Sequence, residues 1–164
     1  MIRERKPADD AAIRRLNEEA FGGTVESELV EALRATDLTA IELVAVEGAE
    51  IVGHLLMSAL SVFIDDDAIP TLSLAPMSVR PNHQRLGIGS ALVEFGLELA
   101  RQREWQAVVV LGHPAFYPRF GFSAELASHL EAPFSGEAFM ALELVDGSLD
   151  GEDGLVVYPS PFGV

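Results

Sequence analysis

The sequence has no cysteine and few basic residues. Without cysteine among its 164 residues, the chain has no disulfide, no thiolate metal ligand and no cysteine nucleophile. Lysine and arginine number 11 against 26 aspartates and glutamates, which gives a formal net charge of -15. Because phosphate contacts need clustered cations, this balance argues against nucleic-acid binding. Cationic or amine-bearing partners are electrostatically easier, although a surplus of carboxylates more commonly serves solubility.

The chain also lacks a hydrophobic run long enough to span a membrane. Its most apolar stretch, IVGHLLMSALSVFI, is too short and is interrupted by glycine, histidine and serine. The start, MIRERKPADD, is charged and has no apolar stretch of the kind that a signal peptide needs. We therefore expect a cytoplasmic protein without a membrane or nucleic-acid partner.

The remaining composition fits one globular domain. A chain of this length that is 49% apolar and 23% charged can bury a core but has little room for two domains. Hydrophobic periodicity and turn residues predict the first elements. These are a strand at 1 to 5, a helix that starts near Pro7 and stops at Gly22, a short helix at 25 to 33, and strands at 41 to 46 and 51 to 64 joined by a turn at Gly48. Asp65 to Asp67 are interpreted as a solvated hairpin tip in preference to a metal site.

The segment TLSLAPMSVRP changes its apolar face within one expected strand. Leu72 and Leu74 share one parity, whereas Met77 and Val79 share the other, so the apolar face slips by one residue around Pro76. A strand changes face in this way at a bulge, where proline is also tolerated. The pattern predicts a strand that is kinked and partly detached from its neighbour just before the next turn.

Two glycines stand one residue apart at the start of the following helix, in PNHQRLGIGSALVEFG. Glycine costs roughly 1 kcal/mol in a helix relative to alanine, so the pair needs a reason beyond propensity. A buried strand is expected at Trp105 to Leu111, and a strand, a helix and a strand of these lengths predict a crossover between parallel strands. The expected apolar face of the helix consists of Ile88, Ala91, Leu92, Phe95 and Leu99.

In that setting the glycine loop is suited to an anion. A helix N-terminus presents unpaired N–H groups and the positive end of the helix dipole, and glycine lets a phosphate come close. Taken alone, the pattern fits a purely structural helix start equally well. It is not a P-loop, because no Gly-Lys-Ser/Thr follows, and it lacks the Gly-x-Gly-x-x-Gly spacing of a dinucleotide fold.

The stretch QRLGIG, Gln84 to Gly89, resembles the Gln/Arg-x-x-Gly-x-Gly/Ala motif of the GNAT superfamily of N-acetyltransferases. A strand ending in MSVRP stands before it, and YPRFGF behind it is similar to the family's Tyr-x-x-x-Gly-Phe. The longer VVVLGHPAFYPRFGF resembles a bacterial subgroup of predicted acetyltransferases. The resemblance covers roughly residues 1 to 145, with the diagnostic motifs within 71 to 122. It implies an α/β fold with a mixed sheet of about seven strands, about four flanking helices, and splayed parallel strands at the cofactor slot.

The resemblance implies an N-acetyltransferase that uses acetyl-coenzyme A. Backbone N–H groups of Arg85 to Ser90 would hold the pyrophosphate, and the strand end before the loop would run along the pantetheine arm. The N–H of Val79 or Met77 would face the thioester carbonyl, where an oxyanion needs stabilisation. Tyr117 falls on the family's general acid, which protonates the departing thiolate. The implied cofactor-binding residues are Met77, Ser78, Val79, Gln84, Arg85, Leu86, Gly87, Ile88, Gly89, Ser90 and Phe116.

The chemistry of acyl transfer is consistent with these assignments. It needs a bound acyl donor, an oxyanion site, a neutral amine and a proton for the sulfur. Because no cysteine can carry the acetyl group, we expect direct attack by a primary amine in a ternary complex. The sequence departs from the family at GHPAFY, which is compressed and has His113 near the family's usual asparagine. The helix before Tyr117 is therefore expected to shrink to a single turn that opens at Pro114.

The sequence does not identify a general base. His54 is interpreted either as a proton relay through water or, more simply, as a histidine satisfied within the sheet. Ser73, Ser78 and Glu42 are weaker candidates, and ordered water alone can take the amine proton. Two other functions stay open, a noncatalytic acyl-coenzyme A sensor and a protein acetylase that acts on basic tails.

The C-terminal residues carry no chemical motif. AFMALEL, residues 138 to 144, predicts a last strand of the domain, and the acidic DGSLDGEDG that follows predicts a loop. The apolar tail LVVYPSPFGV is expected either to add an edge strand or to pack across the partner in a homodimer. We thus expect an N-acetyltransferase domain at 1 to 145 and a C-terminal extension at 146 to 164.

Overall fold

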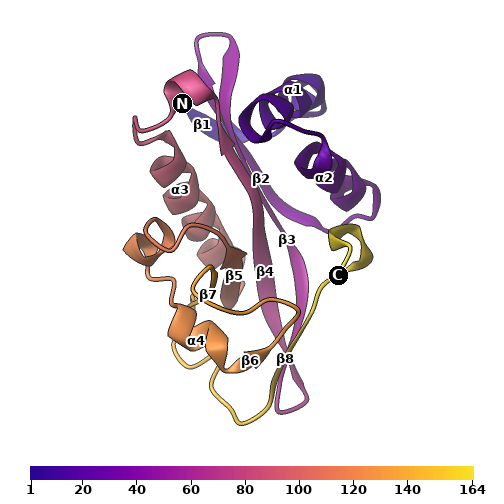
Figure 1. The fold of residues 1–164 in the computed structure, drawn as a ribbon, viewed down its shortest axis with the longest axis vertical. Helices are drawn as coiled ribbons and strands as arrows, with labels where there is room; N and C mark the ends of the chain where they lie inside the picture. Colours follow the sequence, from indigo (N-terminus) through magenta and orange to yellow (C-terminus); the bar gives the residue numbers. More distant parts are fainter. The chain divides into compact units, whose positions relative to one another are not determined.

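The computed structural model describes residues 1–164 and contains a mixed sheet of eight strands with four α-helices (Figure 1), which confirms the predicted fold class. The helices are α1 (Asp10–Phe21), α2 (Val25–Ala35), α3 (Ile88–Gln102) and α4 (Ala124–Ser128). The strands are β1 (Ile2–Glu4), β2 (Thr39–Glu47), β3 (Glu50–Ile64), β4 (Asp67–Val79), β5 (Ala107–Leu111), β6 (Leu130–Glu131), β7 (Phe139–Glu143) and β8 (Gly154–Val157). None of the helices combines the length and the apolar composition of a membrane-spanning segment.

The chain divides into two compact units. The N-terminal unit contains residues 1–58 and 75–99, and the C-terminal unit contains residues 59–74 and 100–164. The long strands β3 and β4 pass through both. Along the sheet the hydrogen-bonded order is β1-β2-β3-β4-β5-β7, and β8 pairs with β3 and β6 beside this path.

The N-terminal unit is built on an antiparallel ladder. β1 pairs with β2, and β2 pairs with β3 from Thr39 opposite Ser58 to the turn after Glu47. The helices α1 and α2 lie on one side of these strands and α3 lies on the other (Figure 1). α1 ends where the sequence predicts, because Gly22 adopts a φ of 75° and its N–H bonds to the Glu18 carbonyl.

α3 packs through only part of the predicted face, because Leu92 is buried as expected but Phe95 is not. Phe95, expected in the core, is 41% exposed, whereas Val93 and Leu97 are buried. The physical reason is Gly96, where a Cβ would stand only 3.3 Å from the side chains of Leu55 and Met57 in β3. The bare backbone at this glycine packs closely against the sheet and turns the helix so that Phe95 points to solvent.

β4 leaves its parallel neighbour partway along its length. Thr71–Leu74 pair in parallel with Ala107–Val110 of β5, which confirms the predicted parallel crossover. The register with β5 ends there, while β4 continues through a cis Ala75-Pro76 peptide bond to Val79. The predicted partial detachment is therefore confirmed.

The inner face of the detached part differs from the prediction. Met77 and Val79, expected to form the apolar inner face, are partly exposed, whereas Ser78 is buried. Ser78 can occupy the interior because its hydroxyl finds a hydrogen-bond partner there, Asn17 of α1. The two apolar side chains consequently face outward.

The C-terminal unit contains β5 to β8. β5 pairs antiparallel with β7, so the strand expected at 138 to 144 is present as β7. The tail adds strand β8, which pairs with Ser61–Ile64 of β3 and with β6. After β8, the buried Tyr158 contacts the rings of Phe134 and Phe162 at centroid distances of 5.2 and 5.0 Å.

The predicted hairpin tip lies between β3 and β4. The carboxylate of Asp65 accepts hydrogen bonds from the N–H groups of Glu152 and Asp153, at 3.1 and 2.8 Å. This aspartate therefore anchors the acidic loop that precedes β8.

Candidate active site

The glycine loop connects β4 to α3. Arg85 and Gly87 have φ values of 65° and 85°, so the backbone enters the left-handed region twice before the helix begins. The N–H groups of Ile88 to Ser90 precede the first intrahelical hydrogen bond, and the N–H of Ala91 bonds back to the Gly87 carbonyl at 3.0 Å. A turn of this kind at a helix N-terminus presents N–H groups and partial positive charge to an anion.

A hydrogen bond ties this loop to the end of β4, because the side-chain amide of Gln84 donates to the Val79 carbonyl at 3.1 Å. Directly after β4, the Arg80 N–H donates to the Val52 carbonyl of β3 at 2.8 Å. The structure therefore brings the predicted residues at 77 to 79 and 84 to 90 together within the N-terminal unit.

Tyr117 and Phe116 belong to the C-terminal unit. The residues before Tyr117 form a single turn that opens at Pro114, as predicted, because the His113 carbonyl accepts the N–H groups of Phe116 and Tyr117, at 3.0 and 3.3 Å. A 3-10 turn, Tyr117–Phe120, follows it directly.

The ring of Tyr117 is buried against a glycine and two aromatic side chains. A Cβ at Gly112 would lie 2.4 Å from the ring, so only glycine leaves room for it. The rings of Phe116 and Phe122 meet it edge-on, with centroids 5.0 and 5.6 Å away. Burial raises the pKa of Tyr117 to about 12, so its hydroxyl keeps its proton at neutral pH. A tyrosine that is protonated at neutral pH can act as a proton donor.

A chain of buried polar side chains lies behind the end of β4. The Ser78 hydroxyl donates to Asn17 Oδ1 at 2.8 Å, and Asn17 Nδ2 lies 3.3 Å from His54 Nδ1. His54 Nε2 is 2.8 Å from the Glu42 carboxylate, to which Arg34 donates two more hydrogen bonds, at 3.0 and 2.5 Å. We call Ser78, Asn17, His54, Glu42 and Arg34 the polar network. Both nitrogens of the fully buried His54 have partners, which confirms the simpler interpretation of a histidine satisfied within the sheet.

The charge in the polar network resides on Glu42 and Arg34. Burial disfavours the Glu42 carboxylate, but hydrogen bonds from His54 and Arg34 outweigh this effect and lower its pKa to about 2. Burial also lowers the pKa of His54, and the hydrogen bond to Glu42 offsets only part of that change. At neutral pH the folded protein therefore holds an anionic Glu42 beside a neutral His54.

Acid is expected to destabilise the protein through these two groups. Both pKa values are lower in the folded state, so the unfolded chain binds more protons and the free energy of unfolding decreases as the pH is lowered. The His54 contribution is lost below its ordinary pKa of 6.5, and the Glu42 contribution is lost between 4.5 and about 2. Replacing Glu42 by glutamine should lower the free energy of unfolding at neutral pH by about 3 kcal/mol and flatten its acid dependence. Urea unfolding across this pH range measures both effects.

The matched control for that experiment is Glu137→Gln, because Glu137 is exposed. This variant should keep the pH profile of the wild type. An acid dependence in Glu42→Gln as steep as in the wild type would show that Glu42 does not carry the effect.

The Ser73 hydroxyl, one of the weaker base candidates, is hydrogen-bonded to Tyr158. No group of three or more histidine, aspartate and glutamate side chains is placed to hold a metal ion. Asn17 belongs to the polar network although no motif marks it; its signal in the sequence is an amide four residues after Ile13, on the apolar face of α1.

Comparisons with known proteins agree with the motif and the fold. Residues 1–124 match the family model described as an acetyltransferase (GNAT) domain. The uncharacterized N-acetyltransferase YhbS of Escherichia coli (strain K12) is 33% identical over 167 residues, which cover 99% of this chain and 98% of the relative.

Two solved structures are similar over almost the whole chain. The GNAT family N-acetyltransferase YhbS from Escherichia coli, in complex with CoA, has a TM-score of 0.90 at 30% identity and covers 100% of this chain and 92% of its own. A GNAT family acetyltransferase from Brucella melitensis, in complex with acetyl-CoA, has a TM-score of 0.81 at 33% identity, with coverages of 99% and 97%. This chain therefore belongs to the GNAT family of N-acetyltransferases.

Proposed function

We propose that this chain transfers the acetyl group of acetyl-coenzyme A to a primary amine, by direct attack in a ternary complex. The observation that carries the proposal is the turn through Arg85 and Gly87, which leads into the unpaired N–H groups of α3. The relatives from Escherichia coli and Brucella melitensis, whose structures contain CoA and acetyl-CoA, support it.

Each part of the cosubstrate has a counterpart in the N-terminal unit. The N–H groups of Arg85 to Ser90 and the positive end of the α3 dipole would receive the pyrophosphate. The partly exposed side chains of Met77 and Val79 suit the pantetheine arm. Ser78 would contribute through its backbone alone, because its hydroxyl is turned inward.

The acetyl group needs an oxyanion site. An N–H of Val79 or Met77 would stabilise the oxyanion that forms when the amine attacks the thioester carbonyl, an effect of a few kcal/mol in comparable sites. Gln84, which bonds to the Val79 carbonyl, would keep the loop and the strand end together. Phe116 would flank the cosubstrate.

Tyr117 would protonate the departing thiolate. The amine nitrogen bonds to the acetyl carbon, the carbon–sulfur bond breaks, and its electron pair goes to sulfur, which takes the phenolic proton. Because burial keeps the pKa of Tyr117 at about 12, the hydroxyl still carries that proton at neutral pH. His54 has no part in this step, since both its ring nitrogens have partners, and water would take the proton from the amine.

The acceptor is proposed to be a primary amine on a small molecule or a peptide. The net charge of -15 favours the approach of a cationic amine. A cytoplasmic location is part of the proposal, because acetyl-coenzyme A is a cytoplasmic metabolite.

The proposal is tested by measuring coenzyme A release from acetyl-coenzyme A across a panel of polyamines, amino acids, aminoglycosides and a lysine-rich peptide. Release that depends on one class of amine, and that saturates with acetyl-coenzyme A, is the expected result. If the protein shows no binding of acetyl-coenzyme A, the proposal is wrong.

A further inference from the structure

Asn17 sets the direction of the hydrogen bonds in the polar network. Its Nδ2 lies 3.2 Å from the Ile13 carbonyl, which can only accept, so the NH₂ group must occupy that side. The same NH₂ group faces His54 Nδ1, so this nitrogen accepts and Nε2 carries the ring proton toward Glu42. Asn17 Oδ1, on the other side, accepts from Ser78. The donors therefore all point from Ser78 toward the Glu42 carboxylate.

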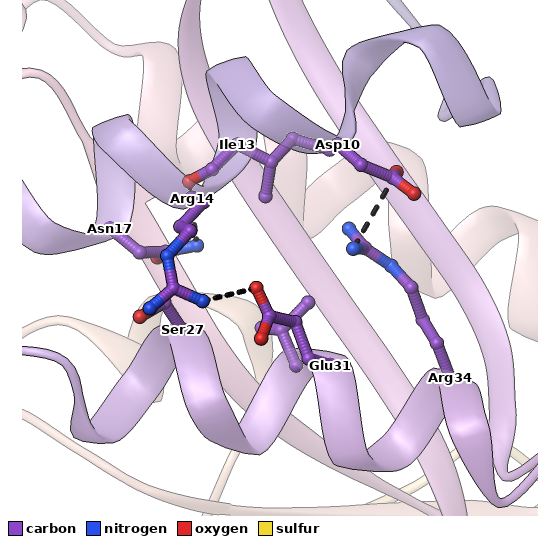
Figure 2. A pocket seen from close by; sticks show the side chains of 8 residues that line it. Asp10, Ile13, Arg14, Asn17, Ser27, Glu31 and Arg34 are labelled. Carbon is purple, nitrogen blue, oxygen red and sulfur yellow. Dashed lines mark hydrogen bonds and ion pairs between the residues drawn. The ribbon is translucent and has the colours of Figure 1, made fainter.

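This arrangement is a poor path for protons. An amide stands in the middle of the network, and an amide neither gains nor loses a proton in the ordinary pH range. On the side of α1 and α2, Asn17 lines a small pocket that has no room for a water molecule. Ion pairs between Arg14 and Glu31 and between Asp10 and Arg34 span this pocket (Figure 2). The network thus acts through geometry and not through proton transfer.

The geometry that it fixes is that of the β4 end. Side chains alternate along a strand, so a Ser78 held inward keeps Met77 and Val79 outward. β5 does not fix this part of β4, because the register between them ends at Leu74. The hydrogen bond from Ser78 to Asn17 is a side-chain anchor at this point of the strand.

We propose that Asn17 and His54 are positioning residues of the acetyl-coenzyme A site, and that they act through Ser78 on the orientation of Met77 and Val79. The inference rests on the proposed function. Asn17 holds Ser78 directly, and His54, fixed between Asn17 and Glu42, holds the Asn17 amide in the orientation that accepts from Ser78.

The test is a double-mutant cycle with Ser78→Ala, Asn17→Leu and the variant that carries both. Isothermal titration calorimetry gives the Kd for acetyl-coenzyme A, and thermal unfolding gives Tm. Each single variant is expected to bind about tenfold more weakly, the effect of one hydrogen bond, and the double variant no more weakly than either single one. Leu33→Ala, a core truncation in α2 outside the network, should lower Tm and leave Kd unchanged.

The outcomes separate this inference from the proposed function. If the wild type does not bind acetyl-coenzyme A, the proposed function fails. If the wild type binds and Ser78→Ala has the same Kd, the positioning role is overturned, whatever happens to Tm. Fully additive losses in the double variant would also overturn it. Should Asn17→Leu fail to fold, Ser78→Ala decides alone, because it removes a single hydroxyl.

Discussion

Gly87→Glu is expected to weaken acetyl-coenzyme A binding by at least about a hundredfold. Gly87 has a φ of 85°, which side-chain-bearing residues rarely adopt, and a Cβ there would point into open space. The substitution therefore strains the turn that orders the N–H groups of Arg85 to Ser90. It also brings a carboxylate to the place where the pyrophosphate would bind, and the two negative charges repel each other. Calorimetric titration measures the loss.

The matched control is Gly48→Glu in the turn between β2 and β3. Gly48 has a φ of 62° and nothing within 4 Å of its Cβ position, so this variant carries the same kind of backbone strain away from the loop. It should lose a similar amount of stability and keep the wild-type affinity. Equal affinities for Gly87→Glu and Gly48→Glu would mean that the glycine loop does not hold the cosubstrate.

Tyr117→Phe is expected to lower kcat by roughly a hundredfold to a thousandfold and to leave the affinity for acetyl-coenzyme A nearly unchanged. The ring stays packed against Gly112, Phe116 and Phe122, and only the hydroxyl that would protonate the thiolate is lost. The loss should appear in acetyl transfer to the amine and not in binding of acetyl-coenzyme A, because the thiolate leaves only during the transfer. Steady-state kinetics with a saturating amine gives kcat and KM separately.

Tyr158→Phe is the control for that variant. Tyr158 lies in the same unit, is also buried, and has a pKa that burial likewise raises to about 12. Tyr158→Phe removes the hydrogen bond to Ser73, which should lower the free energy of unfolding by about 1 kcal/mol and leave kcat unchanged. A wild-type kcat in Tyr117→Phe would remove the acid role from Tyr117 and return the proton donor to water.

The sequence predicts the parts of the site that local chemistry determines. Gly87 and Gly89 stand in a helix start that only a turn or a close ligand explains, and the turn is present with Gly87 in the left-handed region. The sequence also predicts that β4 leaves its neighbour around Pro76, and the parallel register ends at Leu74. The change of buried face that suggested this does not occur, because Pro76 and Ser78 stay buried on the same side as Leu72 and Leu74. Both signals lie within a few residues of the feature that they predict.

The parts that the sequence does not predict depend on contacts between distant segments. Phe95 looks like a core residue by periodicity, but the close approach of Gly96 to Leu55 and Met57 leaves the Phe95 side chain exposed. Ser78 is expected on a polar face, yet Asn17, 61 positions earlier, provides the partner that lets it be buried. No pattern within one helix or strand contains such a pairing.

The central claim is that the N–H groups of Arg85 to Ser90 hold the pyrophosphate of acetyl-coenzyme A. The most direct measurement follows the backbone amide chemical shifts during a titration with coenzyme A and, separately, with desulfo-coenzyme A, which keeps the pyrophosphate. We expect the amides of Gly87, Ile88 and Gly89 to shift most in both titrations, because their N–H groups would donate to the same oxygens. Large shifts confined to other segments, with these three amides unchanged at saturation, would contradict the account.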